Sequence, residues 1–126
     1  LAVSVVSSTQ VSLTWTAQST PGNGYSSITT YTVEYKLSSD STWQSGNTTA
    51  SSPATISGLT TLSTYYFRIK STNAFGTGPT SSDSSVSATL YGIPNVPAQP
   101  TLTQTSGSTS IVVTWTAPAN NGATIS

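Results

Sequence analysis

The chain carries few of the side chains that perform chemistry. Its 126 residues include no His and no Cys, and three carboxylates balance three cations. A serine nucleophile needs a nearby base, but both lysines are predicted in the middle of strands and facing outward. The carboxylates are far apart in the predicted strand order, so the acid pair of a glycosidase is not available. We therefore predict that the chain is not an enzyme and has no catalytic residue. The six charged residues are Glu34, Lys36, Asp40, Arg68, Lys70 and Asp83.

The same composition argues against bound cofactors. Without His or Cys there is no transition-metal site, and without an acidic cluster there is no calcium site. The glycines Gly76 and Gly78 lie between two predicted strands rather than before a helix, so they do not form a phosphate loop. Three cations in the whole chain are too few to form the basic surface patch that binds nucleic acid. No apolar run approaches the roughly 20 residues of a membrane helix. We predict no cofactor, no metal, no nucleic-acid partner and no membrane insertion in these residues.

Four of the six charges fall on two predicted neighbouring strands. Glu34 and Lys36 face outward on one strand, and Arg68 and Lys70 face outward on the other. One interpretation is cross-strand pairing on a solvated sheet face, which contributes roughly 0.2–1 kcal/mol per pair. The other is a contact face for a partner. Exposed ion pairs are common and contribute little, so we favour the first interpretation and keep the second as the candidate partner-contact face.

Hydroxyl and amide groups dominate the predicted surface. Serine and threonine number 25 each, and Asn47-Thr48-Thr49 forms an N-glycosylation sequon in a polar stretch. Asn47 is therefore the candidate acceptor of a covalent glycan. Trp43, just before this stretch, is open to two interpretations, which are packing against the domain and stacking on a sugar.

Apolar and polar residues alternate in seven short runs separated by turn residues. This pattern is typical of an all-β, antiparallel sandwich. The clearest run is residues 65–70, in which every second side chain is large and apolar. The inward side of these runs predicts a buried core of Leu13, Trp15, Tyr31, Val33, Ile56, Leu59, Tyr65, Phe67 and Ile69.

Several of these runs also carry a recognisable set of motifs. They are Trp15, Tyr31-Thr-Val-Glu-Tyr35, Trp43, Gly58-Leu59, Tyr65-Tyr-Phe-Arg-Ile69 and Asn73-Ala-Phe-Gly-Thr-Gly-Pro79. Together they resemble the fibronectin type III family, whose fold is an immunoglobulin-like β-sandwich. The resemblance implies a tyrosine corner, in which the Tyr65 hydroxyl bonds to backbone near Leu59. Thr61 stands where the family usually has Pro, which would loosen the turn. The loop before the last strand has no Arg-Gly-Asp, so integrin binding of that kind has no support.

The chain repeats itself after a proline-rich segment. Residues 10–17 align with residues 110–117 at an offset of 100, and three prolines occupy residues 94–100. We predict a fibronectin type III-like domain at residues 1–90 and a stiff linker at residues 91–97. Residues 98–126 are predicted as the first two strands of a second, incomplete domain. We expect the chain to be an interior window of a longer array, with the missing strands supplied by its own continuation or by a neighbouring subunit.

The function that follows is structural. The repeat, the linker and the missing chemistry predict a module of a tandem-repeat extracellular protein that forms a filament or surface fibre. Its partners would be neighbouring repeats or copies of itself, outside the cell or on its surface. The alternatives are an adhesion module, which would use the charged sheet face or the loops at one end, and a spacer attached to a secreted enzyme.

Overall fold

The computed structural model describes residues 1–81 and 86–125 and divides the chain into two units, Leu1–Tyr91 and Gly92–Ser126. Asp83 lies outside the described residues. Unit 1 contains residues 1–90, the range predicted as the first domain, together with Tyr91. Because the second unit begins at Gly92, it takes in most of the segment that was predicted as a linker.

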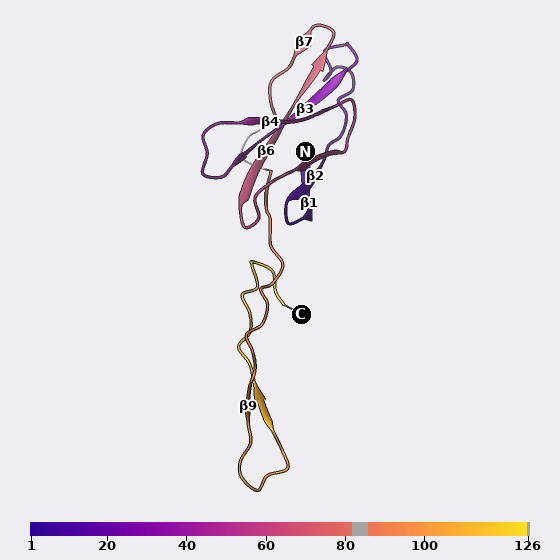
Figure 1. The fold of residues 1–126 in the computed structure, drawn as a ribbon. Coiled ribbons are helices and arrows are strands. Elements are labelled where there is room, and N and C mark those ends of the chain that lie inside the picture. Colours follow the sequence, from indigo (N-terminus) through magenta and orange to yellow (C-terminus); the bar gives the residue numbers. More distant parts are fainter. Residues whose placement is uncertain (82–85, 126) are drawn as a thin grey trace. The chain divides into compact units, whose positions relative to one another are not determined.

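Unit 1 is built from two antiparallel sheets, which confirms the predicted sandwich (Figure 1). The first sheet has the order β1-β2-β5, and the second has the order β4-β3-β6-β7, with β8 also paired to β6. The two-residue β7 falls in a segment that was predicted as loop, and Trp43 lies just before β4 rather than within it. The strands are β1 (Ala2–Ser7), β2 (Gln10–Thr14), β3 (Thr30–Leu37), β4 (Gln44–Thr49), β5 (Ala54–Ser57), β6 (Thr64–Asn73), β7 (Gly76–Thr77) and β8 (Ser87–Thr89).

The pairing of β3 with β6 sets which side chains face the core. Val33 lies opposite Ile69, Tyr35 lies opposite Phe67, and Glu34 lies opposite Arg68 between them. Since side chains alternate along a strand, this register directs the apolar residues inward and the charged residues outward. The buried apolar residues are Val11, Leu13, Tyr31, Val33, Ala54, Ile56, Leu59, Tyr65, Phe67 and Leu90.

Trp15 and Ile69 differ from the prediction, because they are only partly buried against this core. Strand β2 ends at Thr14, so the Trp15 amide bonds to the Ser52 hydroxyl at 3.1 Å rather than to a strand. The indole still packs on Tyr31, with ring centroids 5.2 Å apart. Trp15 and Ile69 both border an open cavity of about 380 Å³. The alternation of apolar residues therefore continues in the sequence as far as Trp15 and Ile69, which the facing sheet covers only in part.

The tyrosine corner is present. The Tyr65 hydroxyl accepts a hydrogen bond from the Thr60 amide at 3.0 Å, one residue beyond Leu59 as expected. The Thr61 hydroxyl donates to the Ser8 carbonyl at 2.8 Å and so ties the corner to the turn between β1 and β2. Thr61, which was expected to loosen this turn because it replaces the usual proline, therefore supplies a hydrogen bond that a proline side chain cannot make.

Unit 2 is an antiparallel hairpin of β9 (Thr101–Thr103) and β10 (Val112–Thr114). Before the hairpin, the amides of Gly92 and Asn95 donate to the carbonyls of Asn121 and Ala119. The predicted linker is therefore hydrogen-bonded within unit 2. Its large apolar side chains are exposed, namely Ile93, Val96, Leu102, Ile111, Val112, Val113, Trp115 and Ile125.

Strand β4 passes close to the core at Gly46. A Cβ atom on this residue would lie 2.6 Å from Ile56 Cδ1 and 3.1 Å from the Val33 carbonyl oxygen. Real Cβ atoms rarely approach other atoms so closely, so glycine allows this edge strand to lie against the core. A Cβ atom on Gly78, in contrast, would have no neighbour closer than 3.7 Å.

We expect Gly46→Ala to lower the free energy of unfolding by about 1–3 kcal/mol, because the added methyl group overpacks the site. Chemical denaturation of the full chain measures this loss. Gly78→Ala is the matched control and should show no loss. If the two variants unfold at the same denaturant concentration as the wild type, the placement of β4 is wrong.

Candidate functional site

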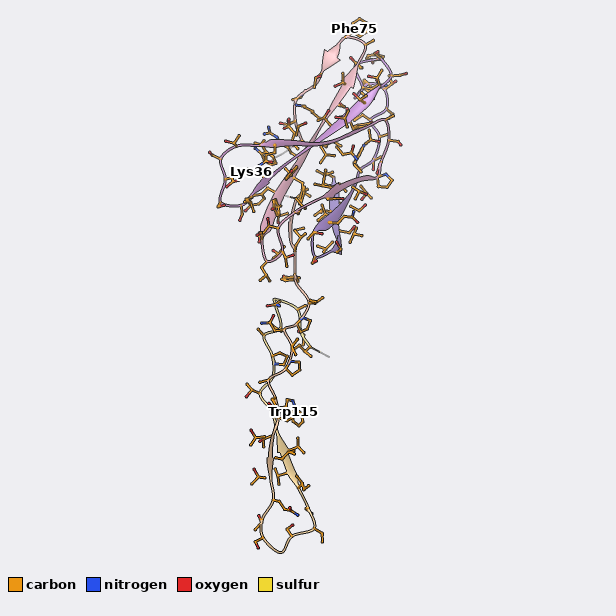
Figure 2. All side chains as sticks on the ribbon, in the orientation of Figure 1. Lys36, Phe75 and Trp115 are labelled. Carbon is orange, nitrogen blue, oxygen red and sulfur yellow. The ribbon has the colours of Figure 1, made fainter. Side chains whose placement is uncertain are left out.

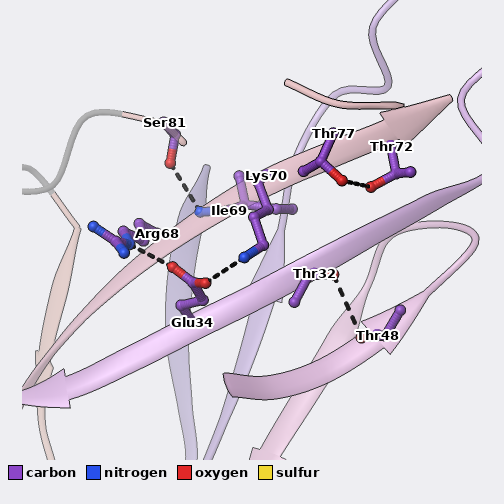
Figure 3. Close-up of polar contacts among 9 residues, drawn as sticks. All are labelled: Thr32, Glu34, Thr48, Arg68, Ile69, Lys70, Thr72, Thr77 and Ser81. Atoms are coloured by element: carbon purple, nitrogen blue, oxygen red, sulfur yellow. Dashed lines mark hydrogen bonds and ion pairs between the residues drawn. The ribbon is translucent and has the colours of Figure 1, made fainter. Parts of the chain in front are cut away.

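The charged sheet face, composed of Glu34, Lys36, Arg68 and Lys70, lies on β3 and β6 as predicted from the sequence. Arg68 Nε donates to Glu34 Oε2, and Lys70 Nζ donates to Glu34 Oε1, each at 2.6 Å (Figure 3). The Glu34 side chain is only 12% exposed, so the two cations largely cover it. Both carboxylate oxygens are engaged, which leaves neither in a position to act as a base.

Trp43 joins this face from the segment before β4. The Arg68 guanidinium carbon lies 4.2 Å from the Trp43 ring centroid, and the Lys36 ammonium lies 5.2 Å from it. Cations over an indole are attracted by its electron-rich face. This geometry favours packing for Trp43 over a free platform for a sugar. The three cations of the chain therefore gather around one carboxylate and one indole.

The charges around Glu34 determine its acidity. The hydrogen bond from Lys70 is the largest influence and lowers the pKa of the Glu34 carboxyl. Burial opposes it, and the hydrogen bond and charge of Arg68 lower the pKa further. The net result is a pKa below the ordinary value, so the carboxylate is ionised at neutral pH. The cluster fastens β3 to β6 at the sheet surface.

Threonine pairs bind the strands where charges are absent. The hydroxyls of Thr72 and Thr77 are 2.9 Å apart across β6 and β7, and Figure 3 draws the bond between them. The hydroxyls of Thr64 and Thr89 are 2.8 Å apart across β6 and β8. Such cross-strand hydroxyl pairs contribute on the order of 0.2–1 kcal/mol each. They add side-chain bonds to the backbone pairing of a sheet that carries few charges.

Asn47 is exposed on the edge strand β4. Its Nδ2 atom donates to the Thr55 carbonyl at 3.5 Å, a long bond that holds the side chain weakly. The acceptor nitrogen of the sequon thus lies at the surface. Glycosylation of Asn47 remains a prediction.

The loop end of unit 1 comprises the loop at residues 18–28, between β2 and β3, and residues 71–79, which contain the turn from β6 into β7. Asn73 Nδ2 donates to the Asn23 carbonyl at 2.9 Å, which joins the two loops. The loops border an open cavity of about 410 Å³. Phe75 projects from the tip of the domain (Figure 2). Loops at one end of the sandwich were predicted as an alternative contact surface, but none of these residues was predicted individually. The asparagines and glycines shared by both loops are the signal that could have found them.

Neither metal chemistry nor membrane insertion gains support from the described structure. Within residues 1–81 and 86–125, no three residues of the His, Cys, Asp and Glu types form a group that could hold a metal ion. Over the same residues, the chain forms no membrane-crossing apolar helix.

Comparison with known proteins gives consistent matches. The Fibronectin type III domain family matches residues 1–87. Protein sidekick-1 of Gallus gallus is 30% identical over 117 residues, which is 90% of this chain but 5% of that protein. A crystal structure of titin domains A168–A170 is 30% identical, with a TM-score of 0.64 over 71% of this chain and 30% of that one. The structure of titin kinase and its flanking domains is 32% identical, with a TM-score of 0.58 over 65% of this chain and 15% of that one.

The charged sheet face predicts a dependence of stability on acid. Because the pKa of Glu34 is lowered on folding, its ionised form stabilises the fold above the usual value of about 4.3. That stability is lost as pH falls through the lowered pKa. In Glu34→Gln we expect a flatter plot of unfolding free energy against pH below about pH 4.3, and a loss of up to about 1 kcal/mol at neutral pH.

Lys36→Gln serves as the control, because the Lys36 ammonium lies over Trp43. This variant should keep the acid-dependent loss of the wild type. Urea denaturation from pH 2.5 to 7, in steps of roughly half a pH unit, resolves the two curves. An unchanged pH slope in Glu34→Gln would show that the cluster does not stabilise the fold.

Proposed function

The chain belongs to the fibronectin type III family, and from this premise we propose that it is a structural spacer of an extracellular tandem array. The array would take the form of a filament or surface fibre, in which neighbouring repeats are the partners. The observation that carries the proposal is the recurrence of one hairpin in both units. The chain spans about 5% of the curated relative that it matches, so the role of the whole protein is part of the proposal.

The recurrence holds in the sequence and in the pairing of apolar residues across each hairpin, with the first strand of unit 2 shifted by one residue relative to the offset of 100. Residues 10–17 and 110–117 share the ending Thr-Trp-Thr-Ala. In unit 1, Val3 pairs with Leu13, and in unit 2, Leu102 pairs with Val113, so each hairpin places apolar residues opposite each other. A chain that starts the same fold twice has the organisation of a module array, in which each unit adds length.

The side-chain chemistry also fits a spacer. The sequence has no His or Cys, and the Glu34 carboxylate is occupied by Arg68 and Lys70. Because Glu34 is used inside the fold, its geometry favours the structural interpretation of the charged sheet face over the adhesion alternative. The similarity to domains that flank titin kinase supports a second candidate, a spacer beside an enzyme.

The surface supports an extracellular setting. Charged residues make up 5% of the chain, so either its hydroxyl groups alone or attached sugar would have to hydrate it. Asn47 presents its sequon at an exposed position on β4. A glycan there would supply the hydration that charge does not.

The test uses material isolated from the natural source. An antibody raised against residues 1–126 should detect a denatured polypeptide several times larger than 12.9 kDa. Limited proteolysis should cut it into a ladder whose steps correspond to one repeat of about 100 residues. Electron microscopy should show filaments or fibres that the antibody labels. A soluble polypeptide of one or two domains, with neither a longer precursor nor assembly, would overturn the proposal. A catalytic domain in the same polypeptide would favour the second candidate.

A further inference from the structure

We propose that the loop end of unit 1 is a binding site for a neutral carbohydrate. This site goes beyond the spacer role and does not depend on it. Three features of the loop end support a sugar as its ligand, namely its uncharged cavity, its fixed loops and its exposed aromatic side chains.

The cavity suits a small polar ligand that carries no charge. Its volume of about 410 Å³ lies within the range of roughly 300–1,000 Å³ typical of small-molecule sites. None of its lining residues is charged. The amide and hydroxyl groups of Gln18, Ser71, Asn73 and Thr77 line it. They already make hydrogen bonds within unit 1, and each keeps further donor or acceptor capacity that matches sugar hydroxyls. Ile28 and Phe75 add an apolar surface.

The two loops are held in place before any ligand arrives. Asn23 accepts the Tyr25 amide on its side-chain oxygen at 3.0 Å, while its carbonyl accepts Asn73 Nδ2. Asn73 in turn accepts the Phe75 amide on Oδ1 at 2.9 Å. Two asparagines therefore fix both loop tips and link them across the cavity. A site fixed in this way loses little conformational entropy on binding.

Aromatic side chains project from both fixed tips. Phe75 is 88% exposed, and Tyr25, next to the cavity-lining Gly24, is 80% exposed. Tyr25 also has a φ of 59°, a left-handed conformation that a bulky residue adopts only when its surroundings hold it. Large aromatic rings normally contribute to a fold by burial. Rings that are exposed by a constrained backbone are available for stacking on a ligand.

The chemistry favours a sugar over the other ligands that stack on aromatic rings. Nucleic acids carry phosphates, and a phosphate-binding site needs cations that the lining residues do not provide. The three cations of the chain lie on the charged sheet face instead, where Arg68 and Lys70 engage Glu34. A neutral glycan has apolar C–H faces that stack on rings and hydroxyls that match the amides. The loop end offers both kinds of partner.

The test begins with a microarray of immobilised neutral and charged glycans, probed with the full 126-residue chain. We expect binding to one or more neutral glycans. A soluble oligosaccharide of the bound type is then titrated into the isotope-labelled chain. Its NMR shift changes should be confined to residues 18–28 and 71–79. Phe75→Ala should weaken binding by about tenfold, as for an aromatic anchor, while Phe75→Tyr should retain it.

Trp115→Ala is the matched control, because Trp115 is a 69% exposed aromatic residue in unit 2 (Figure 2). It should leave binding unchanged, whereas a general affinity of sugars for exposed rings would lower it. The proposal fails if no neutral glycan binds, if only charged glycans bind, or if Phe75→Ala binds as tightly as the wild type. It also fails if a protein segment, rather than a sugar, occupies the loop end in native material.

Discussion

The burial of two apolar sheet faces against each other is the constraint on which the rest of unit 1 depends. The chain has no cysteine to form a disulfide and few charges to form ion pairs. Leu13, Val33 and Phe67 are fully buried between the sheets, and each such side chain contributes about 1.5–3 kcal/mol. Their register fixes which residues face outward. The position of the charged sheet face on β3 and β6 therefore follows from the core, because burial of the inward side chains directs the residues between them to the outer face.

Unit 2 shows the same strand pattern without that burial. Val11 and Leu13 are fully buried in β2, whereas the aligned Ile111 and Val113 are exposed. The sequences are nearly alike in character, so propensity alone does not account for the difference. In unit 1 a second sheet covers the apolar side, and β2 is paired on both edges by β1 and β5. In the described part of unit 2, residues 92–125, β10 is paired with β9 alone.

Period-two alternation, with turn residues between the runs, was enough to predict the sandwich, most of its core and the outward direction of Glu34, Arg68 and Lys70. Their grouping also required the expectation that the two strands are neighbours. Alternation works because the two faces of a strand differ in solvent contact along its whole length. It failed at Trp15, since alternation does not show where a facing sheet ends. The bond between Asn23 and Asn73 spans 50 positions of the chain and depends on how the strands bring two loops together. Only the folded arrangement reveals such a contact. The same is true of the placement of Lys36 and Arg68 over the Trp43 ring.

Native-state amide hydrogen exchange on the 126-residue chain tests this account most directly. If burial between sheets is the source of stability, the amides of β2 should exchange only when unit 1 unfolds globally. The amides of β10 should exchange at least about 100-fold faster, because an isolated hairpin is marginally stable. Equal protection of the two strands would show that strand sequence and pairing suffice without a facing sheet, and would contradict the account.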